Sequence, residues 1–275
     1  ARYQADPNPA KVNLGVGVYF DDQGKLPLLQ CVRAAEQAMM EKPAPRGYLP
    51  IDGIAAYDNG VKSLVFGADS DVVQSGRVAT VQAIGGTGAL RIGADFLKKV
   101  SPNARVLISD PSWENHRALF TQAGFTVGTY RYYDAANRGI NFAGFLADLQ
   151  AAPAETIVVL HACCHNPTGY DITPAQWDEV VQVVKSRKLT AFLDMAYQGF
   201  GHGIAEDGAV VGKFVAAGVN FFVSTSFSKS FSLYGERVGA LSVVCQSKEE
   251  AGRVLSQLKI AIRTNYSNPP THGAA

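Results

Sequence analysis

The stretch Val78-Ala-Thr-Val-Gln-Ala-Ile-Gly-Gly-Thr-Gly-Ala-Leu-Arg-Ile-Gly-Ala-Asp-Phe-Leu-Lys-Lys-Val100 decides the fold. Its first seven residues are typical of a buried strand, and residues 88–100 have the spacing of an amphipathic helix. Further strands are predicted at 105–109, 125–130, 156–161, 189–193, 220–225 and 237–244, and further helices at 113–123, 142–150, 174–187, 208–217 and 248–263. Strands that alternate with helices pair in parallel through right-handed crossovers. The sequence therefore predicts an α/β fold in which a mostly parallel sheet lies between helices.

The composition disfavours several classes of protein. Of the 275 residues 47% are hydrophobic and 18% are charged, and the charged share is below the roughly 25% usual for soluble proteins. This balance favours an ordered chain with a large interior or a large subunit interface. The formal net charge is 25 − 24 = +1. A charge so close to zero gives no electrostatic reason to expect a nucleic-acid partner or a membrane surface.

The cysteines and the apolar runs of the sequence indicate the cellular compartment in which we expect the protein. Cys31, Cys163, Cys164 and Cys245 do not have the pattern of a disulfide framework, so we expect a reducing compartment. The first residues contain no apolar region of a signal peptide. No apolar run approaches the ~18–20 residues that cross a bilayer. We therefore expect a cytoplasmic protein without a membrane partner.

A glycine-rich turn follows the strand at 78–84, and ligands of open α/β sheets bind at such strand ends. Gly85-Gly86-Thr87-Gly88-Ala89 opens the next helix, where a close backbone and free N–H groups attract phosphate. The dinucleotide pattern G-x-G-x-x-G fails when it is counted from Gly86, because the sixth position is Arg91. The turn is therefore either a phosphate site or simply a tight connection between strand and helix.

The next two strand ends carry ring and amide groups. Trp113 could stack on a flat ligand or pack under the sheet. In an extended segment His161, Cys163 and His165 would share one face, as metal ligands do, but no further Cys/His cluster supplies a fourth ligand. The other interpretation is that Asn166 directs its amide at a ligand. Cys163 and Cys164 are then ordinary buried residues.

Two charged residues complete the series of strand ends. Asp194 ends an apolar strand, where a carboxylate needs a cationic partner; it is a helix cap, a structural ion pair, or an anion beside a cationic ring nitrogen. Lys229 is flanked by serine and phenylalanine. It is either a surface lysine on a turn or a partly buried amine whose lowered pKa suits a Schiff base. Ser226 and Arg237 could complete a phosphate site.

One ligand explains all of these groups: pyridoxal phosphate, a planar phosphorylated ring that binds lysine covalently and pairs its ring nitrogen with an acid. The stretch Ser226-Phe-Ser-Lys229-Ser-Phe-Ser-Leu-Tyr-Gly-Glu-Arg237 resembles the lysine motif of the class I, fold-type I aminotransferases that act on aspartate and aromatic amino acids. Further motifs match in order: Tyr48-Leu-Pro-Ile-Asp-Gly53, Gly85-Gly-Thr-Gly-Ala-Leu-Arg91, Pro111-Ser-Trp113, His165-Asn-Pro-Thr-Gly169, Asp194-Met-Ala-Tyr197-Gln-Gly-Phe200 and Ile262-Arg263-Thr-Asn-Tyr-Ser-Asn-Pro-Pro270. The residues after Lys229 are more similar to those of the aromatic-amino-acid enzymes.

The resemblance implies a role for each matching residue. Lys229 forms the internal aldimine and then carries the proton between Cα and the cofactor. Asp194 keeps the ring nitrogen protonated, while Tyr197 and Asn166 bind the phenolate oxygen of the ring. Trp113 stacks on the ring and, with Asn166, borders the substrate carboxylate. The phosphate is held by Gly86, Thr87, Ser226 and Arg237.

The resemblance also implies a homodimer with shared sites. Tyr48 reaches the phosphate of the neighbouring subunit, and Arg263 crosses the interface to pair with the side-chain carboxylate of a dicarboxylic substrate. Gly17 lies in an arm that closes over the substrate.

The implied domains are an N-terminal arm with part of a small domain at 1–44 and a large cofactor-binding domain at 45–275. A turn at 21–24, a helix at 28–42 and the breakers Pro43 and Pro45 mark the first segment. No residue matches the arginine that binds the substrate α-carboxylate in the family's C-terminal small domain, so this domain is expected to be missing. For residues 1–275 alone we expect cofactor binding at best and very weak transamination.

The predicted function is transfer of the amino group from an aromatic or acidic L-amino acid to a 2-oxo acid such as 2-oxoglutarate or oxaloacetate. The mechanism is ping-pong, with pyridoxal 5'-phosphate as cofactor and no metal. Two alternatives remain: another fold-type I enzyme with the same cofactor, such as a lyase or decarboxylase, and a non-catalytic relict of the fold.

Overall fold

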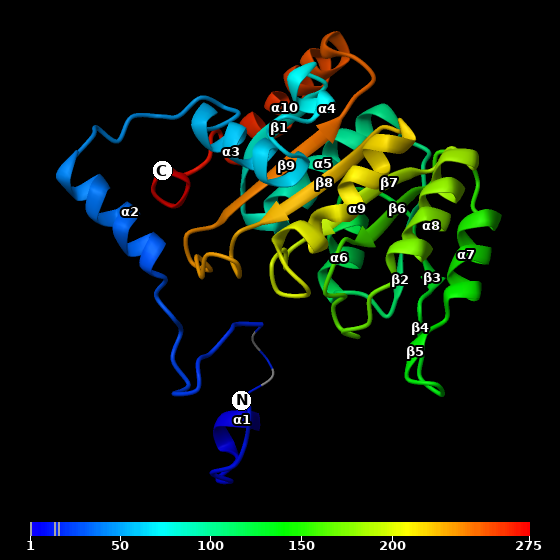
Figure 1. Ribbon diagram of the computed structural model, residues 1–275, viewed down its shortest axis with the longest axis horizontal. Coiled ribbons are helices and arrows are strands. Elements are labelled where there is room, and N and C mark those ends of the chain that lie inside the picture. Colours follow the sequence, from blue (N-terminus) through cyan, green and yellow to red (C-terminus); the bar gives the residue numbers. More distant parts are fainter. Residues whose placement is uncertain (1, 14, 16) are drawn as a thin grey trace.

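A sheet of seven strands forms the centre of the molecule, in the order β1-β9-β8-β7-β6-β2-β3 (Figure 1). The computed structural model describes residues 2–13, 15 and 17–275. The strands are β1 (Val78–Ile84), β2 (Val106–Asp110), β3 (Val127–Arg131), β6 (Ile157–His161), β7 (Thr190–Met195), β8 (Phe221–Ser226) and β9 (Val238–Val244). Each corresponds to a strand predicted from the sequence, and the α/β fold is confirmed.

One strand of the sheet runs against the others. The pairs β2–β3, β2–β6, β6–β7 and β7–β8 are parallel, as expected. Strand β9 instead pairs antiparallel with both β8 and β1. The sheet is therefore mostly parallel, as predicted; β9 is the exception, because the chain returns from β8 to β9 through the loop 227–237 rather than through a crossover helix.

Helices cover both faces of the sheet (Figure 1). One face packs against α5 (Gly85–Val100), α6 (Glu114–Gln122) and α10 (Lys248–Asn265), and the other against α3 (Ala55–Phe66), α4 (Asp71–Gln74), α7 (Phe142–Ala151), α8 (Pro174–Ser186) and α9 (Ile204–Ala217). Neighbouring residues of a central strand serve opposite layers: Phe192 belongs to the first cluster, whereas Ala191 and Leu193 belong to the second. Among the described helices, none is long and apolar enough to cross a membrane.

Some elements were not predicted from the sequence, and one predicted helix begins at an earlier residue. The helix α3 contains Asn59 and Gly60, which lower helix propensity, and the burial of Val61 and Val65 in the core outweighs this. A small hairpin, β4 (Tyr133–Asp134) and β5 (Gly139–Ile140), extends the chain after β3. The helix α9 begins at Ile204, four residues earlier than predicted, with two acidic residues in its first turn that favour a helix start.

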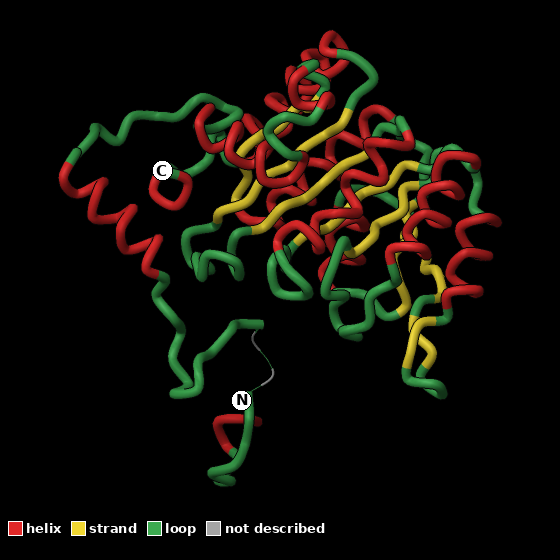
Figure 2. The backbone as a smooth tube through the Cα atoms, viewed as in Figure 1, coloured by secondary structure: helices red, strands yellow, loops and turns green. Residues whose placement is uncertain are grey.

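The N-terminal segment lies apart from the sheet (Figure 2). It contains α1 (Arg2–Ala5) and α2 (Gln30–Glu41). The described residues of the predicted arm at 12–19 are neither helix nor strand, and Leu14 and Val16 lie outside the described residues. The helix α2 agrees with the prediction for 28–42 and ends before Pro43.

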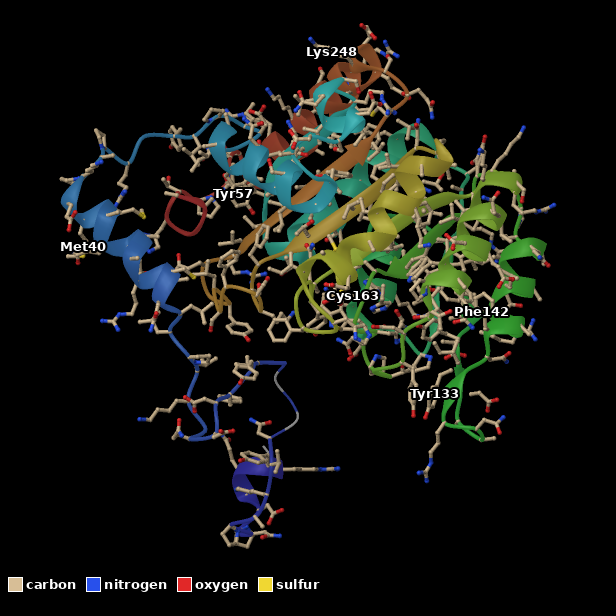
Figure 3. All side chains as sticks on the ribbon, in the orientation of Figure 1. Met40, Tyr57, Tyr133, Phe142, Cys163 and Lys248 are labelled. Atoms are coloured by element: carbon tan, nitrogen blue, oxygen red, sulfur yellow. The ribbon has the colours of Figure 1, made fainter. Side chains whose placement is uncertain are left out.

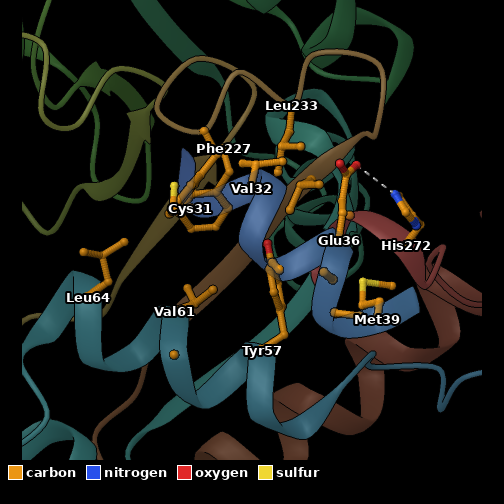
Figure 4. A pocket seen from close by; sticks show the side chains of 17 residues that line it. Cys31, Val32, Glu36, Met39, Tyr57, Val61, Leu64, Phe227, Leu233 and His272 are labelled. Carbon is orange, nitrogen blue, oxygen red and sulfur yellow. Dashed lines mark ion pairs between the residues drawn. The ribbon is translucent and has the colours of Figure 1, made fainter. Parts of the chain in front are cut away.

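A cavity of about 380 Å³ separates α2 from the body of the molecule (Figure 4). Apolar side chains of α2, α3 and the loop 227–237 line it, together with the last turn, η1 (His272–Ala274). Val32 is the buried residue of α2, and Glu36 faces His272 at 3.5 Å. Met40, on the same helix, is 75% exposed (Figure 3). The helix α2 is therefore held by few contacts.

Asp58, in the first turn of α3, is expected to limit the stability of the protein at high pH. It is 7% exposed, and its Oδ1 atom has no hydrogen-bond partner among the described residues. Burial raises the pKa of Asp58 to about 8. The folded protein therefore keeps a proton that the unfolded chain releases, and stability falls as pH rises from about 4 to about 8. We expect Asp58→Asn to raise the free energy of unfolding at pH 8 by a few kcal/mol and to have little effect near pH 4.

Urea denaturation at several pH values measures this effect. The exposed Asp69→Asn variant, in the turn after α3, is the matched control and should follow the wild-type profile. Parallel profiles for Asp58→Asn and the wild type would contradict the prediction.

Candidate active site

One pocket of about 290 Å³ opens at the carboxyl ends of β6, β7 and β8, beside the start of α5. It contains ten of the twelve predicted site residues: Gly17, Gly86, Thr87, Trp113, Asn166, Asp194, Tyr197, Ser226, Lys229 and Arg237. The other two lie outside it. Tyr48 is 94% exposed, and Arg263, exposed near the end of α10, bonds to Ser267.

One end of the pocket is built to hold an anion. The first N–H groups of a helix such as α5 have no partner within the helix and carry partial positive charge. Gly85 has a φ of 71°, and a Cβ at this position would lie 2.5 Å from an Nη atom of Arg237. A Cβ on Gly86 would lie 2.9 Å from the Cβ of Ser226. The two glycines therefore let the guanidinium and the serine approach the helix start, where Thr87 adds a hydroxyl.

A buried carboxylate lies at the end of β7. Asp194 is 7% exposed, and its Oδ2 atom lies 2.8 Å from Nε2 of His116, which is fully buried. The Nδ1 atom of His116 lies 2.9 Å from Oγ of Ser112, which in turn lies 3.3 Å from Nε2 of His161. No role was predicted for His116 from the sequence. The available signal was its place three residues after Trp113, in the first turn of α6, which puts both rings on one side of the helix.

Two histidines, His161 in the pocket lining and His165 outside it, are neutral at ordinary pH. Both ring nitrogens of His165 are hydrogen bonded, Nε2 to Ser109 and Nδ1 to Thr168, each at 2.8 Å. Burial lowers the pKa of His165 to about 4 and lowers the pKa of His161 well below its usual value. Because its nitrogens already have partners, His165 is a poor metal ligand.

The metal-ligand interpretation of His161, Cys163 and His165 gains no support from this geometry. Within the described residues, the side chains close enough to share an ion are those of Cys163, Cys164 and Asp207. The Asp207 carboxylate already accepts hydrogen bonds from backbone N–H groups of the loop 199–202.

Lys229 lies half-buried in the loop after β8, with Nζ 4.9 Å from the centre of the Tyr197 ring. Burial lowers the pKa of Lys229, the nearby Asp194 raises it, and Arg237 lowers it further. Burial raises the pKa of Tyr197, and a hydrogen bond with the Asn166 side chain opposes this rise. An amine whose charged form is disfavoured is a nucleophile close to neutral pH. This arrangement defines an α/β enzyme that holds a phosphorylated ring at the carboxyl ends of its strands.

Comparison with known proteins identifies the family. A family model described as aminotransferase class I and II matches residues 9–275. The chain is 64% identical over 273 residues to an aspartate aminotransferase of Pseudomonas aeruginosa and 52% identical over 274 residues to an aromatic-amino-acid aminotransferase of Escherichia coli. Each alignment covers 99% of this chain and 69% of the relative. A solved structure is also similar: the crystal structure of an aromatic-amino-acid aminotransferase from Burkholderia pseudomallei covalently bound to pyridoxal phosphate. Its sequence is 65% identical and its fold matches with a TM-score of 0.97. The match covers 99% of this chain and 68% of that chain.

The chain belongs to the family of class I and II aminotransferases. It is an aminotransferase that depends on pyridoxal phosphate, and its substrates are amino acids and 2-oxo acids. The resemblance inferred from the motifs is confirmed.

The neutral state of His165 predicts a loss of stability in mild acid. The unfolded chain binds a proton on this histidine near pH 6.5, whereas the folded protein binds it only near pH 4. The free energy of unfolding should therefore fall by roughly 3 kcal/mol from this residue as pH falls through that interval. His165→Gln should remove this part of the slope.

Denaturation at pH 7, 6 and 5 measures the slope. His202→Gln, which changes an exposed histidine, is the control and should keep the wild-type slope. If His165→Gln and His202→Gln lose stability in parallel, His165 is not the source of the acid sensitivity.

Proposed function

We propose that this enzyme transfers the amino group of aromatic and acidic L-amino acids to 2-oxoglutarate or oxaloacetate, in two half-reactions at one pocket. The observation that carries the proposal is the half-buried Lys229 amine, which lies over the Tyr197 ring in the pocket that Asp194 also lines. Relatives named as aspartate, tyrosine and aromatic-amino-acid aminotransferases support this range of substrates.

The residues of the pocket fit pyridoxal phosphate. A phosphate dianion fits at the start of α5, beside Gly86, Thr87, Ser226 and Arg237. Only glycine, which has no side chain, lets the backbone come this close to its neighbours. Asp194 would face the ring nitrogen, since a buried carboxylate favours a protonated partner. When bound, the cofactor supplies an electron sink that makes the substrate Cα proton removable.

The remaining side chains position the reacting groups. Lys229 would hold the cofactor through Nζ and, once released, carry the proton to and from Cα as general base and acid. Tyr197 and Asn166 would donate hydrogen bonds to the ring oxygen. Trp113 would cover one face of the ring and, with Asn166, border the substrate carboxylate, while Gly17 lies at the mouth of the pocket.

A homodimer explains the two predicted residues that lie outside the pocket. Tyr48 and Arg263 are exposed and reach no group of their own pocket. In a two-fold dimer the same pair can complete the partner's pocket, Tyr48 at the phosphate and Arg263 at the side-chain carboxylate of the substrate. The low share of charged residues is consistent with a large interface of this kind.

We further propose a cytoplasmic location and a division of the chain at residue 44. Four free cysteines, among them the exposed Cys31, are consistent with a reducing compartment. The sparse contacts of α2 and the irregular chain that flanks it support an arm with part of a small domain at 1–44 and the cofactor domain at 45–275.

Removal of Lys229 tests the proposed chemistry. Wild-type protein mixed with pyridoxal phosphate and reduced with borohydride should gain the mass of one covalent cofactor, and Lys229→Ala should gain none at this site. Transamination of aspartate and tyrosine by the full chain should fall by about 10²–10⁴-fold or more, because both nucleophile and proton carrier are lost. Lys185→Ala, an exposed lysine of α8, is the control.

Two results would overturn the proposal. One is unchanged activity of Lys229→Ala, as expected of a relict whose cofactor plays no part. The other is a full-length chain that binds the cofactor but converts neither glutamate nor aspartate to its 2-oxo acid, as expected of a lyase or decarboxylase.

Mixed dimers test the shared site. Lys229→Ala and Arg263→Ala subunits are each expected to be nearly inactive on aspartate. When they are refolded together, half of the dimers contain one pocket with both residues intact, so activity should recover to about a quarter of the wild-type value.

The control mixes Lys229→Ala with the double variant Lys229→Ala/Arg263→Ala, which cannot form an intact pocket. Activity of the test mixture that stays at the level of its separate components would contradict sharing across the dimer.

A further inference from the structure

Two carboxylates outside the pocket bind the backbone of the two loops that form its wall. Asp171 accepts hydrogen bonds from the N–H groups of Cys164 at 2.6 Å and His165 at 2.8 Å. Asp207 accepts them from Gly199 at 2.8 Å, Gly201 at 2.9 Å and His202 at 2.9 Å. Within residues 17–275, neither carboxylate forms an ion pair, so their partners are these N–H groups.

We propose that Asp171 and Asp207 are positioning residues, which fix the loops that present Asn166 and Tyr197 to the cofactor. The inference rests on the proposed roles of Asn166 and Tyr197 at the ring oxygen. Neither aspartate lines the pocket itself.

Asp171 stabilises an unfavourable backbone conformation just before Asn166. Cys164 has a φ of 51°, in the left-handed region that is unfavourable for a residue with a side chain. Successive N–H groups around such a residue converge into a concave site for an anion. The Asp171 carboxylate occupies this site with one oxygen on each N–H group. It therefore fixes the direction of the chain immediately before Asn166.

Asp207 holds the loop that follows Tyr197. Gly199 and Gly203 have φ angles of 96° and 150°, and a Cβ on Gly201 would lie 2.7 Å from Oδ1 of Asp207. The loop thus wraps closely around a carboxylate that is 5% exposed. Burial alone would raise the pKa of Asp207, but the backbone hydrogen bonds bring it below its usual value, so the group is ionised at neutral pH.

The two loops contact each other behind the pocket. The Sγ atoms of Cys163 and Cys164 and a carboxylate oxygen of Asp207 lie within 4.8 Å of one another. The Sγ atom of Cys164 also lies 4.0 Å from the carbonyl oxygen of Tyr197. On the pocket side, Asn166 and Tyr197 both line the cavity, and the Asn166 side chain is near enough to lower the pKa of Tyr197. Displacement of either loop therefore disturbs both side chains that face the ring oxygen, and a small error at such a site weakens its hydrogen bonds.

The test uses Asp171→Asn and Asp207→Asn in the full chain loaded with pyridoxal phosphate. Each change keeps the size of the side chain but removes its charge and sets an amide N–H₂ group against a backbone donor. Hydrogen bonds to the ionised ring oxygen lower the pKa of the bound cofactor, so their weakening should shift the visible absorption titration upward by roughly half to one pH unit. Amide hydrogen exchange in the loops 164–166 and 199–202 should quicken in the protein without cofactor.

Asp178→Asn is the matched control, because this exposed aspartate of α8 pairs with Lys213 and touches neither loop. It should leave both measurements at their wild-type values. Variants that unfold more easily but keep the wild-type titration would show a merely structural role and overturn the inference. If Asp207→Asn does not fold, the exposed Asp171→Asn decides the question alone. Wild-type protein without a covalent cofactor would instead refute the proposed function, which is a separate outcome.

Discussion

The close approach of β9 to the start of α5 is the constraint on which the site depends. A Cβ on Gly239 would lie 2.5 Å from the carbonyl carbon of Gly85, so the two segments can come this close only because both residues are glycines without a side chain. The N–H group of Gly85 donates a 2.9 Å hydrogen bond to the carbonyl of Arg237, which joins the two segments. This contact brings a guanidinium, a serine from β8 and the positive end of a 16-residue helix to one point. Without it, the lysine loop between β8 and β9 would have no fixed place opposite Asp194.

The sequence predicted the sheet well because all of its strands except the edge strand β3 are largely buried on both faces. Such strands are short, nearly continuous apolar runs, and their periodicity separates them from the helices that cover them. The direction of β9 was not predicted, since periodicity identifies a strand but not the sense in which it runs. The helix α3 was missed because Asn59 and Gly60 disfavour a helix locally, while its stability comes from packing of Val61 and Val65 against distant residues.

In the candidate site, too, the sequence predicted the residues that local patterns mark and not those whose role depends on distant parts of the chain. Residues that face the pocket follow strand ends, so Gly86, Asp194 and Lys229 could be found one strand at a time. Residues that hold these side chains in place are not identified by a position at a strand end. His116 is fully buried against Asp194, and Asp171 binds backbone of the chain that precedes it; both are identified only once the fold brings their partners together. Polar groups that act through another residue are therefore the ones that sequence reasoning overlooks.

The sheet order also constrains when the protein can fold during its synthesis. Strand β1 is the first to leave the ribosome, yet its partner in the sheet is β9, with Val78 opposite Val244 and Ile84 opposite Val238. Local β–α units between residues 106 and 226 can pair as they emerge, whereas β1 and the apolar side of α5 must wait for almost the whole sheet. During this interval the unpaired strand is open to association with other nascent chains. The strand β9, the last of this sheet in chain order, thus closes both the sheet and the cofactor pocket.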